Sequence, residues 1–113
     1  MKVLVFDDVL CGRAREYEVA NLDLHFYAHA DEAVAIVARE KPDVVLMDYS
    51  MDAKHSGEDA IRALRSQGMP RGGKIVAISS DPRSNERMLT AGADDAIPKT
   101  HVKGYLSRLS KLK

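Results

Sequence analysis

Short apolar runs alternate with helical patterns along the whole of this 113-residue chain. The runs at Lys2–Phe6, Asp43–Met47 and Lys74–Ser79 are short, continuous and rich in β-branched residues, which is typical of strands buried on both faces of a sheet. The run at Leu24–Ala30 contains two histidines, and the run at Asp95–Ile97 is weak. Pro98 directly follows the last run, and we expect that strand at a sheet edge because proline cannot donate a ladder hydrogen bond. The predicted strands are Lys2–Phe6, Leu24–Ala30, Asp43–Met47, Lys74–Ser79 and Asp95–Ile97.

Between these runs, apolar residues recur at helical spacing. Ala33, Ile36 and Val37, for example, would lie on one side of a helix. The first helix is the weakest, because Gly12 lowers helix propensity and the apolar positions around it are irregular. Alternating strands and helices predict a parallel sheet with helices on both faces. The predicted helices lie within Cys11–Ala20 and at Asp31–Lys41, Gly57–Gly68, Ser84–Gly92 and His101–Leu112.

The charge balance and the cysteine content limit the classes of function. Seventeen basic and seventeen acidic residues cancel, whereas proteins that coat nucleic acid or anionic membranes usually carry a basic excess. No apolar run approaches the roughly 20 residues of a membrane span, and the single cysteine, Cys11, cannot form an internal disulfide. We therefore expect a cytoplasmic protein without nucleic-acid or membrane partners. The expected organisation is one domain over residues 1–113, without an effector domain, as a monomer or weak dimer.

Polar residues follow four of the predicted strands. The working site of a parallel α/β sheet lies beyond the carboxyl ends of its strands, so these side chains should meet there. Carboxylates about 4 Å apart repel by several kcal/mol at an effective dielectric of about 20, and would therefore need a cation. The residues at these strand ends are Asp7, Asp8, Asp48, Ser79, Ser80 and Lys99.

This combination of side chains indicates phosphoryl chemistry. Mg²⁺ is commonly held by a few carboxylates and several waters, together with phosphate oxygens. A lysine can neutralise the remaining phosphoryl charge, and a hydroxyl can donate to another phosphoryl oxygen. An aspartate can act as the nucleophile and form an aspartyl phosphate. The sequence therefore predicts Mg²⁺-dependent formation and hydrolysis of an aspartyl phosphate.

Five stretches resemble the receiver domains of two-component response regulators, in particular the stand-alone, CheY-like kind. Each stretch alone is a weak signal, but five in the right order and strand context are specific and cover essentially the whole chain. The resemblance implies a flavodoxin-like fold with strand order 2-1-3-4-5. The matching stretches are VLVFDD, KPDVVLMDYSM, GEDAIRALR, IVAISS and AGADDAIPK.

The resemblance also implies how such a protein works. Asp48 would accept the phosphoryl group, Lys99 would contact it, and Ser79 would be the switch hydroxyl. The donor would be a histidine kinase or a histidine phosphotransfer protein, and the output would be altered binding to an unidentified protein target. Such a protein would not be an enzyme, apart from catalysing its own phosphorylation and dephosphorylation.

The same resemblance implies a metal site and a set of modulating positions. Mg²⁺ would be held by Asp8, Asp48 and the backbone carbonyl of Ser50, with Asp7 acting through water. The modulating positions would be Ser50, Ser80, Asp81 and Ala96.

Several residues depart from the family pattern. Ala96 replaces the aromatic residue that usually lies three positions before the lysine and turns inward on activation. Thr100 replaces the usual proline after Lys99, and we expect a trans Lys99–Thr100 bond because a cis bond would cost roughly 2.5–4 kcal/mol. Asp52 stands at another usual proline, the loop DAKHSG looks one residue longer than usual, and the first helix about one turn shorter. Ser80 is bulkier than the residue usually found after the switch position.

Two alternative functions remain open on the sequence. The chain could be a constitutive interaction module of receiver fold with little or no switching, which Ala96 and Thr100 favour. It could also be a metal-dependent phosphatase, although its aspartates lack the nucleophile–x–acid spacing of the aspartate-nucleophile phosphatases.

Overall fold

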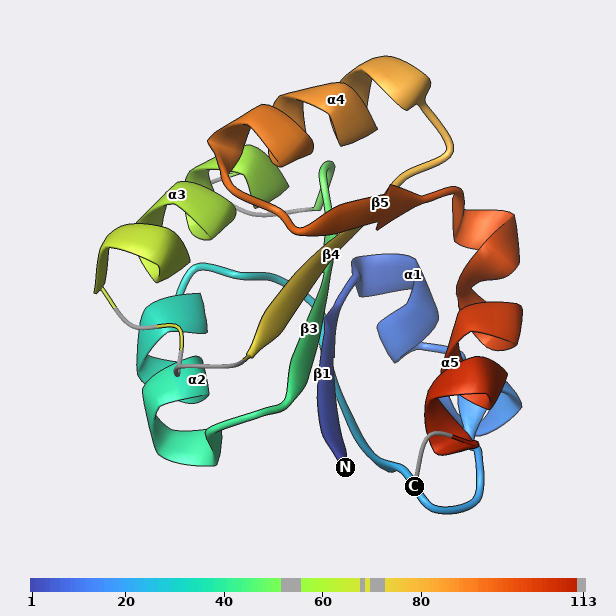
Figure 1. The fold of residues 1–113 in the computed structure, drawn as a ribbon. Coiled ribbons are helices and arrows are strands. Elements are labelled where there is room, and N and C mark those ends of the chain that lie inside the picture. Colours follow the sequence, from blue (N-terminus) through green and yellow to red (C-terminus); the bar gives the residue numbers. More distant parts are fainter. Residues whose placement is uncertain (52–55, 68, 70–72, 112–113) are drawn as a thin grey trace.

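Five parallel strands form a single sheet in the order β2-β1-β3-β4-β5. The computed structural model describes residues 1–51, 56–67, 69 and 73–111, and Figure 1 shows the chain from end to end. This strand order confirms the flavodoxin-like fold and the position of the last strand at an edge. The strands are β1 (Lys2–Phe6), β2 (Asp23–Tyr27), β3 (Val44–Asp48), β4 (Lys74–Ile78) and β5 (Asp95–Ile97).

Helices cover both faces of this sheet, as predicted. The helices α2, α3 and α4 lie on one side, and α1 and α5 lie on the other (Figure 1). There are two short 3₁₀ segments among the described residues: η1 follows α1, and η2 precedes α5. The bounds are α1 (Asp8–Cys11), η1 (Ala14–Tyr17), α2 (Ala33–Glu40), α3 (Gly57–Gln67), α4 (Pro82–Ala91), η2 (Lys99–His101) and α5 (Val102–Ser110).

The first helix differs from its prediction. A helix within Cys11–Ala20 is wrong, because α1 begins at Asp8 and ends at Cys11. Asp7 caps it by accepting hydrogen bonds from the backbone nitrogens of Val9 and Leu10. The chain then turns at Gly12 into the 3₁₀ segment η1. The helix α1 has four residues.

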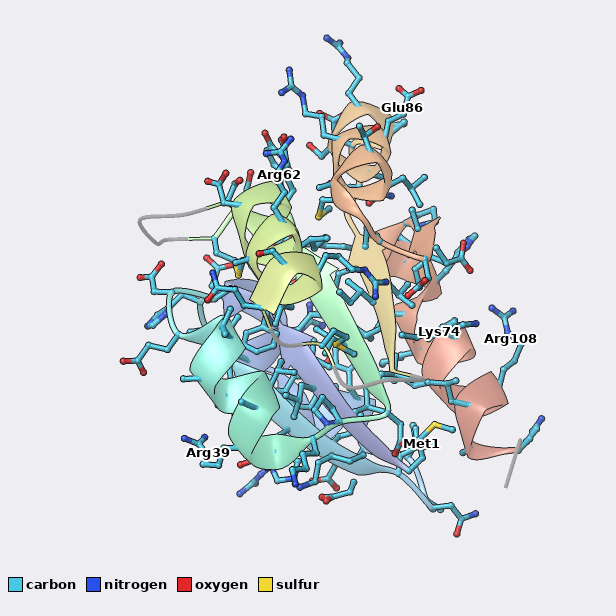
Figure 2. All side chains as sticks on the ribbon, turned by 60° about the vertical axis from the view of Figure 1, so that its left-hand side comes forward. Met1, Arg39, Arg62, Lys74, Glu86 and Arg108 are labelled. Carbon is cyan, nitrogen blue, oxygen red and sulfur yellow. The ribbon has the colours of Figure 1, made fainter. Side chains whose placement is uncertain are left out.

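Strand residues alternate between two cores, one on each face. Leu4 and Phe6 of β1 pack with α2, α3 and α4. Val3 and Val5 pack with α1 and α5. All four of these side chains are fully buried, so the apolar runs do belong to strands covered on both faces. Charged side chains such as those of Arg62, Glu86 and Arg108 point away from the sheet, as Figure 2 shows.

One further expectation is met among the described residues. The Lys99–Thr100 peptide bond is trans. No described helix has the length and apolar character that crossing a membrane requires. The departures expected at Asp52 and in the loop DAKHSG fall largely outside the described residues, as do the predicted helix ends at Gly68 and Leu112.

Candidate functional site

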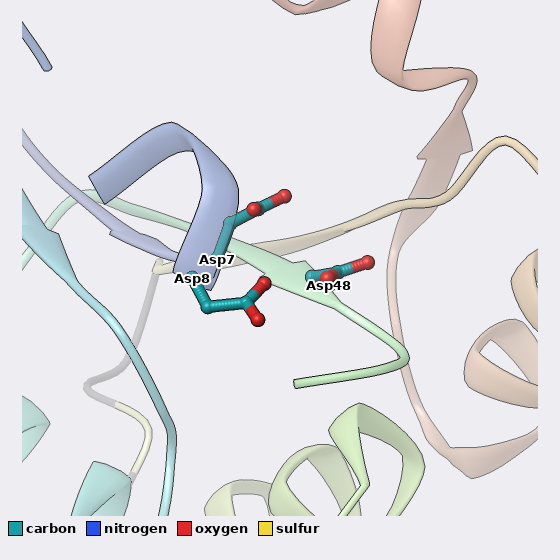
Figure 3. A group of neighbouring side chains, drawn as sticks. All are labelled: Asp7, Asp8 and Asp48. Atoms are coloured by element: carbon teal, nitrogen blue, oxygen red, sulfur yellow. The ribbon is translucent and has the colours of Figure 1, made fainter. Parts of the chain in front are cut away.

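Three carboxylates meet beyond the carboxyl ends of β1 and β3 (Figure 3). Asp7 and Asp8 follow β1, and Asp48 is the last residue of β3. One carboxylate oxygen from each residue lies within 4.8 Å of the other two. Asp7 is fully buried and Asp48 is 2% exposed, whereas Asp8 is partly exposed. Asp8 is therefore the member of the cluster that solvent reaches most easily.

The two carboxylate oxygens of Asp7 have different partners, one in the helix α1 and one in the acidic cluster. Its Oδ1 accepts hydrogen bonds from the backbone nitrogens of Val9 at 2.9 Å and Leu10 at 3.1 Å. Its Oδ2 faces the Lys99 ammonium at 3.0 Å. A helix cap and a cation site would look like competing interpretations of an Asp-Asp pair in a sequence. Here the first aspartate caps α1 and also contributes a carboxylate to the site.

Lys99 brings a positive charge to two of the three carboxylates. It follows β5 in η2, and its Nζ lies 3.2 Å from Oδ2 of Asp48 as well as 3.0 Å from Oδ2 of Asp7. Burial alone would lower the pKa of Lys99, but the two carboxylates outweigh burial and raise the pKa. Apart from Lys99, no described residue offers a donor to either Oδ2 atom.

The pKa of Asp48 is raised to about 6. Burial is the largest cause and the charge of Asp7 the second, while Lys99 opposes both only in part. One ammonium therefore leaves three carboxylates incompletely neutralised, and two of their buried oxygens lack a second partner. Hard oxygen donors in this arrangement fit a divalent cation such as Mg²⁺.

Ser79 lies at the adjacent strand end. It follows β4, whose Ile78 pairs with Asp48 of β3. Ser79 is 8% exposed, and its Oγ accepts a hydrogen bond from the backbone nitrogen of Asp81 at 3.1 Å. The four charged residues expected at the site and this hydroxyl are thus brought to neighbouring strand ends.

The other predicted positions lie around this centre. Ser50 is an exposed residue two positions beyond Asp48, and Ser80 is exposed beside Ser79. Asp81 caps α4 by accepting from the backbone nitrogen of Arg83. Ala96 is half-buried in β5, where it pairs with Ala77 of β4.

Two residues that shape the site were not singled out from the sequence. A Cβ atom on Gly57 would lie 1.9 Å from the backbone oxygen of Asp48, so only glycine lets α3 approach the end of β3 this closely. Asn85 bonds through its side chain to the ends of β4 and β5. An asparagine within an otherwise helical pattern is a weak sequence signal for such a contact, because asparagine is a poor helix former.

The chain belongs to the receiver-domain family. The model of the response regulator receiver domain matches residues 9–109. The nitrate/nitrite response regulator protein homolog of Haemophilus influenzae is 29% identical over 99 residues, which cover 83% of this chain and 47% of that protein. The two-component response regulator ORR2 of Oryza sativa subsp. indica is 34% identical over 89 residues, covering 77% and 35%. This chain therefore spans less than half the length of these relatives.

Solved structures agree on the fold. The receiver domain of the sensor histidine kinase PA1611 of Pseudomonas aeruginosa, at 22% identity, has a TM-score of 0.79 over 98% of this chain and 94% of that one. That structure holds a magnesium ion coordinated in its active-site cleft. A CheY-like receiver domain from Methylobacillus flagellatus, at 17% identity, has a TM-score of 0.79 over 99% and 97%.

Family membership settles the class of protein. It is a receiver domain of a two-component system. Members of this family are not enzymes apart from their own aspartyl phosphorylation. The phosphatase alternative disagrees with this membership.

Proposed function

We propose that this receiver accepts a phosphoryl group on Asp48 in a Mg²⁺-dependent reaction and signals by altered binding to a protein partner. One observation carries the proposal. The buried carboxylate of Asp48 has an oxygen 3.2 Å from the Lys99 ammonium and lies within 4.8 Å of carboxylate oxygens from Asp7 and Asp8. A nucleophile, a cation for the phosphoryl oxygens and a metal-binding pair of carboxylates are thereby close together.

The residues that would hold Mg²⁺ are Asp8, Asp48 and the backbone carbonyl of Ser50, with Asp7 acting through water. When bound, the ion would neutralise the carboxylates and the oxygens of the incoming phosphoryl group. Asp8 is partly exposed, and the buried Oδ2 atoms of Asp7 and Asp48 face only the Lys99 ammonium among the described residues, which supports a further cation at this position.

The proposed reaction uses Asp48 as nucleophile. A carboxylate oxygen of Asp48 attacks the phosphorus of a phosphohistidine, the P–N bond breaks, and the imidazole of the donor leaves with the bonding electron pair. Lys99 neutralises phosphoryl charge, and the Ser79 hydroxyl donates a hydrogen bond to a phosphoryl oxygen. In hydrolysis, water attacks the phosphorus, the bond to Asp48 breaks, and inorganic phosphate leaves.

The donor would be a histidine kinase or a histidine phosphotransfer protein, and the output target is a protein yet to be identified. Ser50, Ser80, Asp81 and Ala96 would modulate the lifetime and the readout of the phosphoryl group. That residues 1–113 act as a single domain without an effector stays a prediction, as does a cytoplasmic monomer or weak dimer.

Incubation with MgCl₂ and acetyl phosphate, followed by intact-protein mass spectrometry, tests the proposal. We expect a mass increase of one phosphoryl group that EDTA prevents and Asp48→Asn abolishes. Asp23→Asn, an exposed aspartate on the edge strand β2, serves as the matched control and should behave like the wild-type protein. Absence of any Asp48-dependent adduct, with acetyl phosphate and with beryllofluoride, would reject the proposal.

A second candidate is a receiver that is phosphorylated without being switched. Ala96 favours this candidate, because the half-buried residue at position 96 has no aromatic side chain that could turn inward when Ser79 moves. The amide NMR spectrum of α5 and the partner affinity distinguish the two candidates. Unchanged α5 resonances and unchanged affinity in the phosphorylated protein would support the constitutive module, and a clear shift in either would reject it.

A further inference from the structure

Asn85, in the first half of α4, connects this helix to the ends of two strands. Its side-chain amide nitrogen donates to the backbone carbonyl of Ser79, after β4, and to that of Ile97 at the end of β5, each at 3.1 Å. The Ile97 carbonyl also accepts a hydrogen bond from the backbone nitrogen of Ser79 at 3.3 Å. These three residues therefore form a closed ring of hydrogen bonds that joins α4, β4 and β5.

Ser79 has a second connection to the same helix. Its hydroxyl oxygen accepts from the backbone nitrogen of Asp81, the N-cap of α4, at 3.1 Å. The backbone carbonyl of Asp81 accepts in turn from the backbone nitrogen of Asn85 at 3.2 Å. A displacement of Ser79 therefore disturbs hydrogen bonds that fix the first turns of α4.

The Asn85 side chain acts here as a donor. An amide nitrogen carries two hydrogens, and Asn85 directs them to the two carbonyls. Its Oδ1 is buried and has no donor among the described residues. An aspartate would place a negative oxygen against two carbonyl oxygens, and a leucine of similar shape would leave both carbonyls without this partner.

The surroundings of Asn85 leave room for movement. A groove of about 240 Å³ lies beside the ring and is bordered by Ser79, Asn85, Leu89 and the small Ala96. Met88 is the only fully buried residue of α4, and the side chain of Leu89 remains 42% exposed. Met88 and Ala91 pack against the core, and the hydrogen bonds to the strand ends add a second attachment of α4 at its N-terminal half.

We propose that Asn85 is the positioning residue that transmits the state of Ser79 to α4, in place of the aromatic residue absent from position 96. The proposal rests on the proposed function. When Ser79 moves toward a phosphoryl group on Asp48, two hydrogen bonds break. The Ser79 hydroxyl oxygen no longer accepts from the Asp81 backbone nitrogen, and the Ser79 carbonyl no longer accepts from the Asn85 side chain. The start of α4 is then released from the ends of β4 and β5.

NMR spectroscopy of ¹⁵N-labelled protein with Mg²⁺ and beryllofluoride as phosphoryl mimic tests this role. A bound ¹⁹F signal reports the adduct on Asp48, independently of any change in α4. In the wild-type adduct we expect the two Asn85 side-chain amide resonances to shift and exchange faster with water, and the backbone amides of residues 82–91 to shift.

Variants separate the role of Asn85 from general stability of the helix. Asn85→Asp and Asn85→Leu should still form the adduct, but the adduct-dependent shifts in α4 should be largely lost, since α4 is already released. Thr90→Val is the matched control, because Thr90 bonds only to the Glu86 carbonyl within the helix among the contacts described. This variant should keep the wild-type response.

Two outcomes would overturn the role of Asn85 while leaving the proposed function intact. One is an adduct in which the Asn85 side-chain resonances stay where they are in the free protein. The other is an Asn85→Asp variant with the full wild-type response in α4. A wild-type protein without any bound ¹⁹F signal would instead overturn the proposed function, and the role of Asn85 with it.

Discussion

Asp48 is held in an environment that disfavours its charge. Burial and the neighbouring Asp7 raise its pKa to about 6, and Lys99 offsets them only in part. The folded protein therefore binds a proton on Asp48 more tightly than the unfolded chain does. The stability associated with this proton is fully present below about pH 3.8 and is lost as the pH rises through about 6. Above that range, the metal-free protein carries an ionised Asp48 at a cost in folding free energy.

Asp48→Asn should therefore stabilise the metal-free protein at pH 7.5. A shift of about two pKa units corresponds to about 3 kcal/mol at most, so we expect a gain of about 1–3 kcal/mol in the free energy of unfolding. Urea unfolding in EDTA measures it, with the same comparison at pH 4 as the control. The gain should nearly vanish at pH 4, where Asp48 is largely protonated in the folded state. A gain of equal size at both pH values would contradict the electrostatic cause.

At the scale of elements, the strands followed from the sequence better than the first helix did. β1 and β5 have the predicted bounds, and the apolar run of β1 is continuous. The strand predicted at Leu24–Ala30 ends at Tyr27, since its partner β1 ends at the paired Phe6. The first helix was placed too late because its start depends on Asp7 acting as a cap. A local hydrogen bond of this kind leaves no periodic pattern.

The approach of α3 to the end of β3 requires glycine at position 57. A Cβ atom there would lie 1.9 Å from the Asp48 backbone oxygen, so Gly57→Ala must displace the helix or the strand. We expect a loss of about 2–4 kcal/mol in the free energy of unfolding, together with weaker Mg²⁺ binding.

Gly104→Ala provides the matched control for this substitution. Gly104 lies within α5, and an added Cβ there meets nothing within 4 Å. Its replacement by alanine should stabilise the protein by about 0.5–1 kcal/mol, because glycine is a poor helix former. Chemical denaturation of both variants measures the difference, and a Gly57→Ala protein as stable as the wild type would show that the close approach is not needed.

At the scale of the whole molecule, the sheet brings together residues from four separate parts of the chain. The acidic cluster and Lys99 could be predicted because each residue lies at or just after the carboxyl end of a strand, and the carboxyl ends of parallel strands share an edge of the sheet. The hydrogen-bond ring of Ser79, Asn85 and Ile97 could not be predicted from the sequence, because it depends on how α4 lies against two strand ends. The roles of Asp48, Ser79 and Lys99 came from the resemblance to the family, because the spacing of residues in the sequence does not assign them.

Mg²⁺ should stabilise the whole fold through this cluster. At a Mg²⁺ concentration ten times the dissociation constant, binding to the folded state alone adds about 1.4 kcal/mol to the free energy of unfolding. Asp8→Asn should abolish most of this gain, because it removes the accessible ligand of the three. Urea unfolding with MgCl₂, against KCl of equal ionic strength, measures the effect. An Asp8→Asn protein that Mg²⁺ stabilises as strongly as the wild type would place the ion elsewhere.

In the proposed reaction, Asp48 alone carries the phosphoryl group. Reduction of the phosphorylated protein with borohydride converts an aspartyl phosphate to homoserine, and peptide mass spectrometry then locates the modified residue. We predict homoserine at position 48 alone, only in samples that contained both Mg²⁺ and the phosphodonor. Homoserine at position 7 or 8, or at no position in a protein shown to be phosphorylated, would contradict the assignment.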